Sequence, residues 1–462
     1  MTDVGERHFV GIGGIGMSAL ARILLERGER VSGCDAQANP LLDELRALGA
    51  EIAAGHDASH VARAREVIVT AAIERAHPEI AAARARGVPV RTRGELLAEI
   101  AAGRETIAIC GTHGKTTTTA MVHAIFRAAG ADAGLALGGI DLVLGTNACD
   151  GSSPWFVTEA DESDGSFALL TPMIGVLTNL EPDHVRSHDE YARMREAFAT
   201  FFESRILDTV GTAVIGIDTP ASATIAANLR HRTAVRAGLS EHADVRGTEI
   251  AFADFGSRFT LVVEGRTVGA VELSVPGAIN VQNAVLAAAA AHAAGASFEA
   301  IAHGLRAFRG VHRRFEILAR SPRAIVVDDY AHHPSAVRAT IETARRYHDG
   351  PLVIAFEPHR YSRTAYFARE FAEALKGNDP VYLAPIYGAG EAPIPGISER
   401  SIGGALTAWG TPVRYVGDVH DLEERIAREA PHGALVLLMG AGAITHAAAA
   451  LARRFAAEEA LR

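Results

Sequence analysis

Short apolar runs that fit single strands alternate with helix-length segments along almost the whole chain. The clearest runs are HFVGIG, RVSGCD, EVIVTAAI, TIAIC, WFVTEAD, MIGVLTNLEPDH, RAIVVDDYAHHP, PLVIAFEPH, PVYLAPIY, PVRYVG and ALVLLMGAGAI. This alternation predicts an α/β fold with mainly parallel sheets. Residues 233–275 instead alternate polar and apolar positions between turn glycines. We expect antiparallel hairpins there, at one edge of a middle domain, and then a helix from Asn280 to about Ala294.

Chain length sets the expected number of domains. The 462 residues predict three domains, at roughly 150 residues per domain. The segment AAGRE at 101–105 fits a linker between the first two. We expect the domains to span residues 1–104, 105–316 and 317–462.

Charge and cysteine content exclude several classes of protein. A net charge of −10 disfavours a nucleic-acid-binding protein, because such proteins carry a basic surface. Cys34, Cys110 and Cys149 lie far apart and form no CxxC, so we expect neither a disulfide framework nor a zinc site. The N-terminus does not resemble a signal peptide, and no apolar run is long enough for a membrane span. We therefore expect a cytoplasmic protein without a membrane segment.

The strongest local signal is a glycine loop between an expected strand and an expected helix. It consists of Gly111, Thr112, His113, Gly114, Lys115, Thr116 and Thr117. Glycines let backbone N–H groups converge on phosphate oxygens, and the helix N-terminus favours the negative charge. Lys115 adds a positive charge, and the Thr116 hydroxyl is placed to bind Mg²⁺. Ile109 replaces the first glycine of the standard phosphate-binding loop, so this loop is a shortened variant. The alternative is a glycine turn with an exposed lysine.

Acidic side chains and a histidine follow two further strands, in TEADESD and TNLEPDH. Glu159 and His184 each stand where an expected strand ends. Parallel strands end at one edge of a sheet, which is also the edge of the glycine loop. The two side chains are therefore candidates for holding a metal that bridges nucleotide phosphates to a second substrate. The alternative is an acidic loop with an N-capping histidine, to which Asp161, Glu162 and Asp164 would add negative charge.

The last third of the chain carries two more polar clusters behind strands, in DDYAHHP and FEPHRYSRT. The first contains Asp328, Asp329, His332 and His333. The second contains His359, Arg360 and Arg363, and arginines at a sheet edge suit a carboxylate or a phosphate. Arg313 and Arg314 precede this domain and could reach a nucleotide. The alternative for each cluster is surface charge after a strand.

The first strand runs into Gly11-x-Gly13-x-x-Gly16, and Asp35 follows nineteen residues after the last glycine. This pattern suits a dinucleotide, but a glycine turn of this kind binds any diphosphate. Asp35 is suited to a ribose hydroxyl of NAD or of a UDP-sugar. Because the chain already carries an ATP-type loop and a candidate metal pair, we favour an anchor for a large nucleotide-linked substrate over a nicotinamide site.

Taken together, these motifs resemble the Mur ligases of bacterial cell-wall synthesis over essentially the full chain. The resemblance rests on GIGGIGMS, GTHGKTTTT, EADESD, TNLEPDH, GTNA, DDYAHHP, FEPHRYSRT and GEAPIPG. It is nearest to the branch that joins L-alanine to UDP-N-acetylmuramate. It implies an N-terminal Rossmann-like UDP-binding domain, a central P-loop ATPase domain and a C-terminal Rossmann-like domain that closes the site. It also implies ATP and Mg²⁺, an acyl-phosphate intermediate, and a monomer or weak homodimer.

The resemblance also implies roles for individual residues. The phosphate loop with Lys115 would bind ATP, and Thr116, Glu159 and His184 would hold the metal. Asn280, Asn283, Arg314 and Asp329 would complete the nucleotide pocket. His359, Arg360 and Arg363 would receive the amino acid and the developing oxyanion. UDP would be held by Gly11, Gly13, Gly14, Gly16, Met17, Asp35 and Asn147.

Several positions depart from the family pattern. Ile279 replaces a histidine before Asn280, Arg186 and His188 follow DH where the family tends to have an acid and an aromatic residue, and Ala443 replaces the asparagine of GAGNI. Arg195 lies where related ligases carry a carbamylated lysine, a modification that the alanine ligases do not need. The first two departures bear on affinity for the nucleotide and the metal more than on the type of reaction.

Three other functions compete with this interpretation. The recycling ligase that joins UDP-N-acetylmuramate to a tripeptide typically has Tyr at Ser163 and lacks HRYSRT. A nicotinamide oxidoreductase would explain only the first 40 residues and leaves Lys115 without a role. A non-catalytic UDP-sugar-binding protein would not need Glu159 and His184 together.

Overall fold

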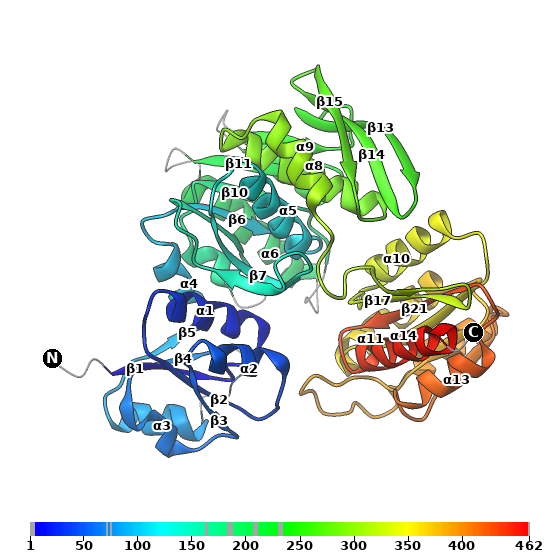
Figure 1. Cartoon of the computed structure of the whole chain (residues 1–462), viewed down its shortest axis with the longest axis horizontal. Coiled ribbons are helices and arrows are strands. Elements are labelled where there is room, and N and C mark those ends of the chain that lie inside the picture. The colour runs from blue at the N-terminus through cyan, green and yellow to red at the C-terminus, as the bar shows by residue number, and fades with distance from the viewer. Residues whose placement is uncertain are drawn as a thin grey trace. The chain divides into compact units, whose positions relative to one another are not determined.

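The computed structural model describes residues 5–70, 73, 76–161, 165–182, 188–206, 211–229 and 234–460. These residues form three β-sheets, each accompanied by helices (Figure 1). The predicted α/β fold with mainly parallel sheets is confirmed. Within these described ranges, no helix is long and apolar enough to cross a membrane.

The N-terminal sheet has five parallel strands in the order β3-β2-β1-β4-β5. Its strands are β1 (Glu6–Val10), β2 (Val31–Asp35), β3 (Glu51–Ala54), β4 (Ala64–Val69) and β5 (Val90–Thr92). Its helices are α1 (Ile15–Glu26), α2 (Pro40–Ala47), the 3-10 helix η1 (Ala58–Arg63), α3 (Pro78–Ala85) and α4 (Arg93–Ala101). The strand order reverses between β1 and β4, and ligands of such sheets bind at the strand carboxyl ends beside that point.

Successive residues of β1 enter different cores, because side chains alternate across a strand. Phe9 packs into the large core that includes α1 and α4. Val10 packs on the other face with Cys34 of β2, Val61 of η1 and Ala83 of α3. His8 points to the same face as Val10, so β1 places a histidine beneath η1 and α3.

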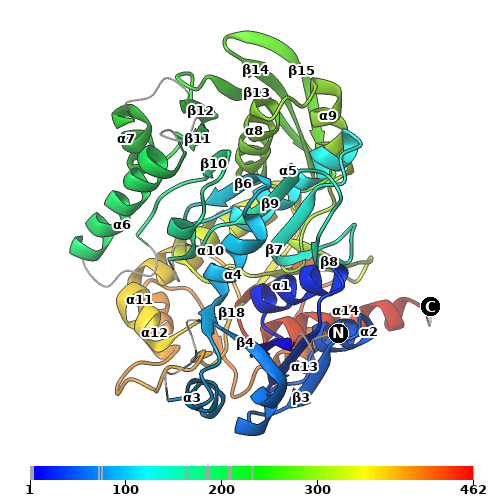
Figure 2. The ribbon, with the colours of Figure 1, turned by 90° about the vertical axis from the view of Figure 1, so that its left-hand side faces the viewer.

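The middle sheet has ten strands in the order β15-β14-β13-β12-β11-β10-β6-β9-β7-β8. Its strands are β6 (Glu105–Cys110), β7 (Gly134–Asp141), β8 (Thr146–Cys149), β9 (Trp155–Glu159), β10 (Ile174–Leu177), β11 (Thr212–Gly216), β12 (Ala234–Gly238), β13 (Val245–Ala253), β14 (Gly256–Val263) and β15 (Arg266–Leu273). Its helical segments are α5 (Lys115–Ala128), η2 (Ser166–Leu169), α6 (His188–Phe201), η3 (Phe202–Ile206), α7 (Pro220–Asn228), α8 (Ala278–Ala293) and α9 (Phe298–Ala307). Figure 2 shows β10, β6 and β9 side by side with α5 next to them.

The edge of this sheet formed by β13, β14 and β15 is a meander. Only residues 254–255 and 264–265 connect its neighbouring strands. A two-residue connection can join only antiparallel strands. The hairpins predicted for residues 233–275 are therefore present, whereas β12 at the start of that range pairs in parallel with β11.

The C-terminal sheet has six strands in the order β16-β17-β21-β18-β19-β20, and only β16 at the edge is antiparallel. Its strands are β16 (Glu316–Arg320), β17 (Ala324–Asp329), β18 (Leu352–Glu357), β19 (Val381–Leu383), β20 (Val413–Tyr415) and β21 (Ala434–Gly440). Its helices are α10 (Pro334–Tyr347), α11 (Tyr361–Leu375), α12 (Arg400–Ala408), α13 (Asp421–Glu429) and α14 (Ile444–Ala460). Alternate strand residues feed two cores, one with α10 to α12 and one with α13 and α14, so helices cover both faces.

Contacts between residues divide the chain into two compact units. The first contains residues 1–250, 259–272 and 281–309, and thus both the N-terminal sheet and most of the middle sheet. The second contains residues 251–258, 273–280 and 310–462. The predicted three-domain boundaries at 104 and 316 stay predictions.

Candidate active site

The loop between β6 and α5 has two positions that only glycine can occupy. Gly111 has a φ of +121°, and a Cβ there would lie 2.4 Å from Thr178 Oγ1. Gly114 has a φ of +80°, and its Cβ would lie 2.3 Å from Asn283 Oδ1. Positive φ is a conformation that side chains disfavour. The loop therefore turns tightly against β10 and α8 and leads its backbone into the N-terminus of α5.

The segment after β10 holds this loop in place. His113 donates its backbone N–H to Asn179 Oδ1 at 2.9 Å, and its carbonyl accepts from Thr178 Oγ1 at 2.7 Å. The Thr112 hydroxyl donates to the Glu181 carbonyl at 3.2 Å. Lys115 Nζ donates to the Gly111 carbonyl at 2.6 Å, so the ammonium group lies over the loop. The predicted loop residues thus form one structure, and Asn179 is a member that its sequence position did not reveal.

A carboxylate meets the first turn of α5. Thr116 Oγ1 donates to Glu159 Oε2 at 3.1 Å, and Gly138 N donates to Glu159 Oε1 at 2.5 Å. Glu159 is the last residue of β9, which pairs directly with β6. The structure therefore brings Thr116 and Glu159 together as the strand-end argument predicts. His184 and Arg186 lie outside the described residues.

The first glycine loop lies at the carboxyl end of β1, beside the reversal of strand order. Gly11 has a φ of +76°, and its N–H donates to the Cys34 carbonyl at 2.8 Å. Gly13 N donates to Asp35 Oδ2 at 2.9 Å. Asp35 therefore uses one carboxylate oxygen to hold the glycine loop. Among the other candidates, Gly14 precedes α1, and Met17 is buried in that helix.

Asn147 joins α1 to the middle sheet. Its side-chain amide donates to the Ile15 carbonyl at 2.7 Å and to Ser18 Oγ at 2.9 Å. Asn147 lies on β8 and is buried. It therefore positions the helix that follows the glycine loop.

In the second unit, Asp329 organises the segment that carries Arg314. Its two carboxylate oxygens accept the backbone N–H groups of Phe315 and Ala331, each at 2.7 Å. Burial raises the pKa of Asp329 to about 6, although Arg314 and the two N–H groups oppose the shift. The Arg314 guanidinium lies 4.9 Å from the centre of the Tyr330 ring. Both candidates thus belong to one packed turn behind β17.

His359, Arg360 and Arg363 gather at the N-terminus of α11. Arg363 donates from Nη1 to His359 Nδ1 at 2.8 Å. Arginine can only donate, so this bond leaves the proton of a neutral His359 on Nε2. Arg360 has a φ of +68° and donates its N–H to the Tyr387 carbonyl at 2.8 Å.

Glu391 supports the same helix start, a role that its sequence position alone did not indicate. Its carboxylate accepts from Ser362 Oγ at 2.6 Å and from Ser362 N at 3.0 Å. The motif GEAPIPG, which contains Glu391, therefore contacts the motif HRYSRT, which contains Ser362, in the folded chain. The sequence shows that both motifs are present, but only the folded structure shows that they are in contact.

Three family models match successive parts of the chain. They are the Mur ligase family catalytic domain at residues 6–105, the Mur ligase middle domain at 109–291, and the Mur ligase glutamate ligase domain at 313–442. The chain belongs to the Mur ligase family. This confirms the family predicted from the sequence motifs.

Full-length relatives agree with the family models. The UDP-N-acetylmuramate--L-alanine ligase of Acidothermus cellulolyticus is 42% identical over 95% of this chain and 92% of its own. That of Burkholderia cenocepacia strain HI2424 is 43% identical over 95% of each chain. The crystal structure of the UDP-N-acetylmuramate-alanine ligase MurC from Thermotoga maritima matches with a TM-score of 0.83 and 28% identity, covering 98% of this chain and 100% of that one.

The positions that depart from the Mur ligase pattern have structural surroundings of their own. Ala443 donates its N–H to Glu357 Oε1 at 3.2 Å, and Ile444 N donates to Glu357 Oε2 at 3.2 Å. Burial raises the pKa of Glu357, although these N–H groups oppose the shift. Asn280, next to Ile279, donates its amide to the Pro276 carbonyl at 2.7 Å. Arg195 lies 6.0 Å from the centre of the Tyr191 ring.

Proposed function

We propose that this chain is an ATP-dependent ligase that joins L-alanine to the carboxylate of UDP-N-acetylmuramate during synthesis of the peptidoglycan precursor. The observation that carries the proposal is the hydroxyl–carboxylate pair of Thr116 and Glu159, 3.1 Å apart, at the glycine loop. The relatives named for this reaction, 42% and 43% identical over 95% of the chain, support the choice of substrates.

The chemistry requires activation of a carboxylate. A carboxylate is a poor electrophile, so transfer of the γ-phosphoryl group of ATP forms an acyl phosphate and provides a leaving group. The amine of L-alanine then attacks the acyl carbon, and phosphate departs from the tetrahedral intermediate. Phosphoryl transfer depends on positioning and on neutralising charge.

The glycine loop can both position the phosphates of ATP and neutralise their charge. The backbone N–H groups of Lys115, Thr116 and Thr117, in the first turn of α5, would bind the phosphates, and the α5 N-terminus favours their charge. Lys115 leaves the Gly111 carbonyl, which it contacts at 2.6 Å, and turns to the β- and γ-phosphates. Asn283, beside Gly114, and Asn280 complete the nucleotide pocket together with Arg314 and Asp329.

Thr116 and Glu159 present a hydroxyl and a carboxylate oxygen, the hard donors that Mg²⁺ prefers, so these residues fit that ion. We infer that they hold it with His184. When bound, Mg²⁺ would neutralise charge on the transferring phosphoryl group.

We assign the two ends of the reaction to the outer domains. The end that binds UDP consists of Gly11, Gly13, Gly14, Gly16, Met17, Asp35 and Asn147. His359, Arg360 and Arg363 receive L-alanine and the developing oxyanion. Domains at residues 1–104, 105–316 and 317–462 fit this division, and we infer that the enzyme works in the cytoplasm.

The test is phosphate release by the purified chain with ATP, Mg²⁺ and UDP-N-acetylmuramate. L-alanine, the tripeptide L-Ala-D-Glu-diaminopimelate, or no acceptor is added, and mass spectrometry identifies the product. Release that depends on L-alanine is the expected result. Release only with the tripeptide would assign the chain to the recycling reaction. No release with either acceptor would contradict both.

A further inference from the structure

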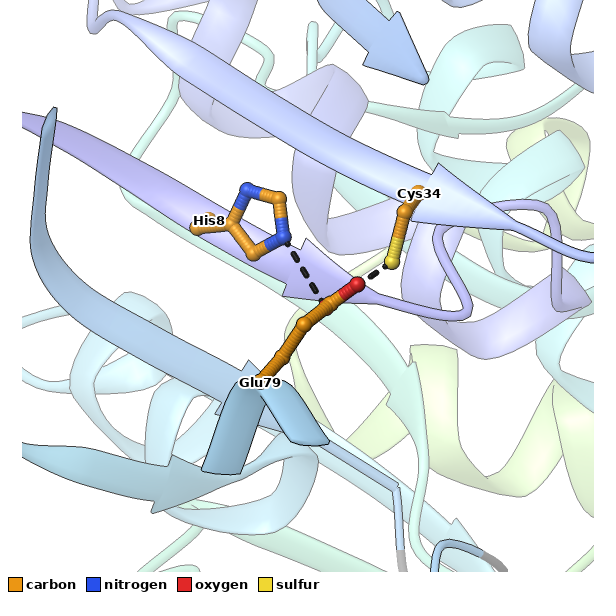
Figure 3. Close-up of side chains that lie close together, drawn as sticks. All are labelled: His8, Cys34 and Glu79. Carbon is orange, nitrogen blue, oxygen red and sulfur yellow. Dashed lines mark hydrogen bonds and ion pairs between the residues drawn. The ribbon is translucent and has the colours of Figure 1, made fainter. Parts of the chain in front are cut away.

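A second cluster of reactive side chains lies in the N-terminal domain, on the face of the sheet covered by η1 and α3. It consists of His8 on β1, Cys34 on β2 and Glu79 in the first turn of α3. All three side chains are buried. Figure 3 shows them directed at one point, with His8 and Cys34 on neighbouring strands.

The ligand-type atoms of this cluster lie close together. His8 Nε2 is 3.2 Å from Glu79 Oε2, and Cys34 Sγ is 3.0 Å from the same oxygen. All three side chains offer an atom within 4.8 Å of the other two. Ligands of a tetrahedral zinc ion lie about 3.4 Å apart, given bonds of about 2.0–2.3 Å. Small rotations of these side chains would therefore place one ion between them.

Two further histidines approach from the solvent side. His56 Nδ1 lies 3.1 Å from Cys34 Sγ and 3.7 Å from Glu79 Oε1. His60 Nδ1 lies 3.0 Å from Glu79 Oε1. An open cavity of about 350 Å³ is lined by His8 and His60, so it reaches one of the buried donors of the cluster.

We propose that His8, Cys34 and Glu79, with His56 as fourth ligand, form a site for one transition-metal dication of the zinc type. Thiolate and imidazole are soft and borderline donors, which select zinc over Mg²⁺ or Ca²⁺. The orientation of His8 supports the assignment. Its Nδ1 is hydrogen-bonded to Ser32 Oγ at 2.9 Å, leaving Nε2 toward the cluster, and metal-binding histidines are held in this way.

A metal ion bound at this cluster must displace the proton of the Cys34 thiol, because the thiolate is the ligand. Burial and the hydrogen bond to Glu79 raise the pKa of the Cys34 thiol. Burial by itself would raise the pKa of Glu79, but hydrogen bonds from His8, Cys34 and His60 lower it to about 2. On binding, the sulfur–metal bond forms and the Cys34 proton passes to solvent.

The sequence predicts no zinc site because its cysteines form no CxxC. The donors of this cluster instead come from four separate segments between His8 and Glu79. The site would tie β1, β2 and α3 together next to the glycine loop, since Cys34 precedes Asp35 and its carbonyl accepts from Gly11 N at 2.8 Å. Its occupancy therefore stabilises the part of the domain that carries the glycine loop.

The test is Co²⁺ binding by the full chain after metal removal with a chelator, followed by ultraviolet absorption. One Co²⁺ per chain with a thiolate-to-cobalt charge-transfer band is expected. The band should disappear in Cys34→Ser and persist in Cys149→Ser. Cys149 is a matched control because it is half-buried and its Sγ lies 3.8 Å from His123 Nε2, yet it belongs to no three-donor cluster in the described residues.

Zinc competition keeps the test decisive if Cys34→Ser does not fold. Glu79→Gln keeps the shape of the side chain, and His56→Ala changes a side chain that is 28% exposed. Each of these two variants should lower the affinity of the chain for Zn²⁺ at least tenfold, as measured by competition with a chromogenic chelator. A wild-type chain without the thiolate band, or a band that survives in Cys34→Ser, overturns the proposal. So does unchanged zinc affinity in both Glu79→Gln and His56→Ala.

Discussion

At the scale of single residues, Lys115 carries the sharpest prediction. A charge about 4 Å from a phosphate is worth about 4 kcal/mol at intermediate dielectric. Lys115→Ala should therefore lower kcat/KM for ATP on the order of a thousandfold. Phosphate release measures the loss, and calorimetry should show UDP-N-acetylmuramate binding unchanged.

The chain offers a matched control for that substitution. Its sequence contains only two lysines, Lys115 and Lys376. Lys376 lies over the Trp409 ring at 5.3 Å in the second unit, so Lys376→Ala removes the same charge without touching the loop. Equal rates of phosphate release by wild type and Lys115→Ala would contradict the assignment of the phosphate loop.

Asp329 predicts a pH dependence of stability. Its pKa of about 6 in the folded chain lies above the ordinary value of 3.8, so the folded state binds the proton more tightly than the unfolded state. The contribution of Asp329 to the free energy of unfolding is then fully present below pH 3.8 and is lost as pH rises through about 6. Asp329→Asn removes this decline, which corresponds to about 3 kcal/mol.

Denaturant unfolding at pH 4 and pH 7 measures the effect. The stability of Asp329→Asn relative to wild type should improve at pH 7 compared with pH 4. Asp349→Asn, at an exposed position, should show no such change. A gap between Asp329→Asn and wild type that does not vary with pH would contradict the prediction.

The spacing of residues in the sequence predicts some contacts within the site but not others. Thr116 and Glu159 could be paired in advance, because parallel strands end at one edge of a sheet and the loop lies there too. The contact of Glu391 with Ser362 depends on a loop whose path no local pattern specifies. The zinc-type cluster was invisible for the same reason, since His8 and Glu79 are separated by 71 residues.

At the scale of elements, the two glycines that flank α5 form a matched pair. Gly114 has a φ of +80° and Gly130 a φ of +78°. A Cβ at Gly114 would meet Asn283 Oδ1 at 2.3 Å, whereas a Cβ at Gly130 would meet nothing within 4 Å. Both alanine variants should lose about 1–2 kcal/mol of stability through the left-handed conformation. Only Gly114→Ala should also lose ATP affinity, by tenfold or more.

Equilibrium binding of a fluorescent ATP analogue separates the two effects, and thermal unfolding checks the shared loss of stability. If Gly130→Ala weakened nucleotide binding as much as Gly114→Ala does, strain in α5 rather than the geometry of the loop would explain the loss of affinity.

Elements with a strong period were predictable from sequence, and edge elements were not. The helix expected from Asn280 to about Ala294 is α8, which spans Ala278–Ala293. The edge strand β16 was not predicted, because its residues 316–320 are half-buried and mix charged with apolar side chains. Its place depends on pairing with β17, a contact that arises only in the folded chain.

At the scale of the whole molecule, the chain passes between its two compact units several times. Sequence reasoning treats domains as continuous stretches, but residues 251–258 and 273–280 belong to the second unit while their neighbours belong to the first. Tyr347 binds both segments within the second unit. Its hydroxyl donates to the Gly256 carbonyl at 2.8 Å and accepts from Gly277 N at 3.2 Å, and its ring stacks on Phe255 at 5.3 Å.

Tyr347→Phe should therefore loosen both segments at once. It keeps the ring that stacks on Phe255 but leaves the Gly277 N–H and the Gly256 carbonyl without the hydroxyl, at a cost of about 1–3 kcal/mol. Hydrogen exchange should rise at residues 251–258 and 273–280, while exchange in β1 and β6 stays unchanged. Tyr366→Phe removes a hydroxyl from a side chain that is 54% exposed and should leave both segments as they are. Faster exchange in one segment alone would mean that Tyr347 does not join them, and the second unit would then depend on other contacts to hold its three pieces of chain.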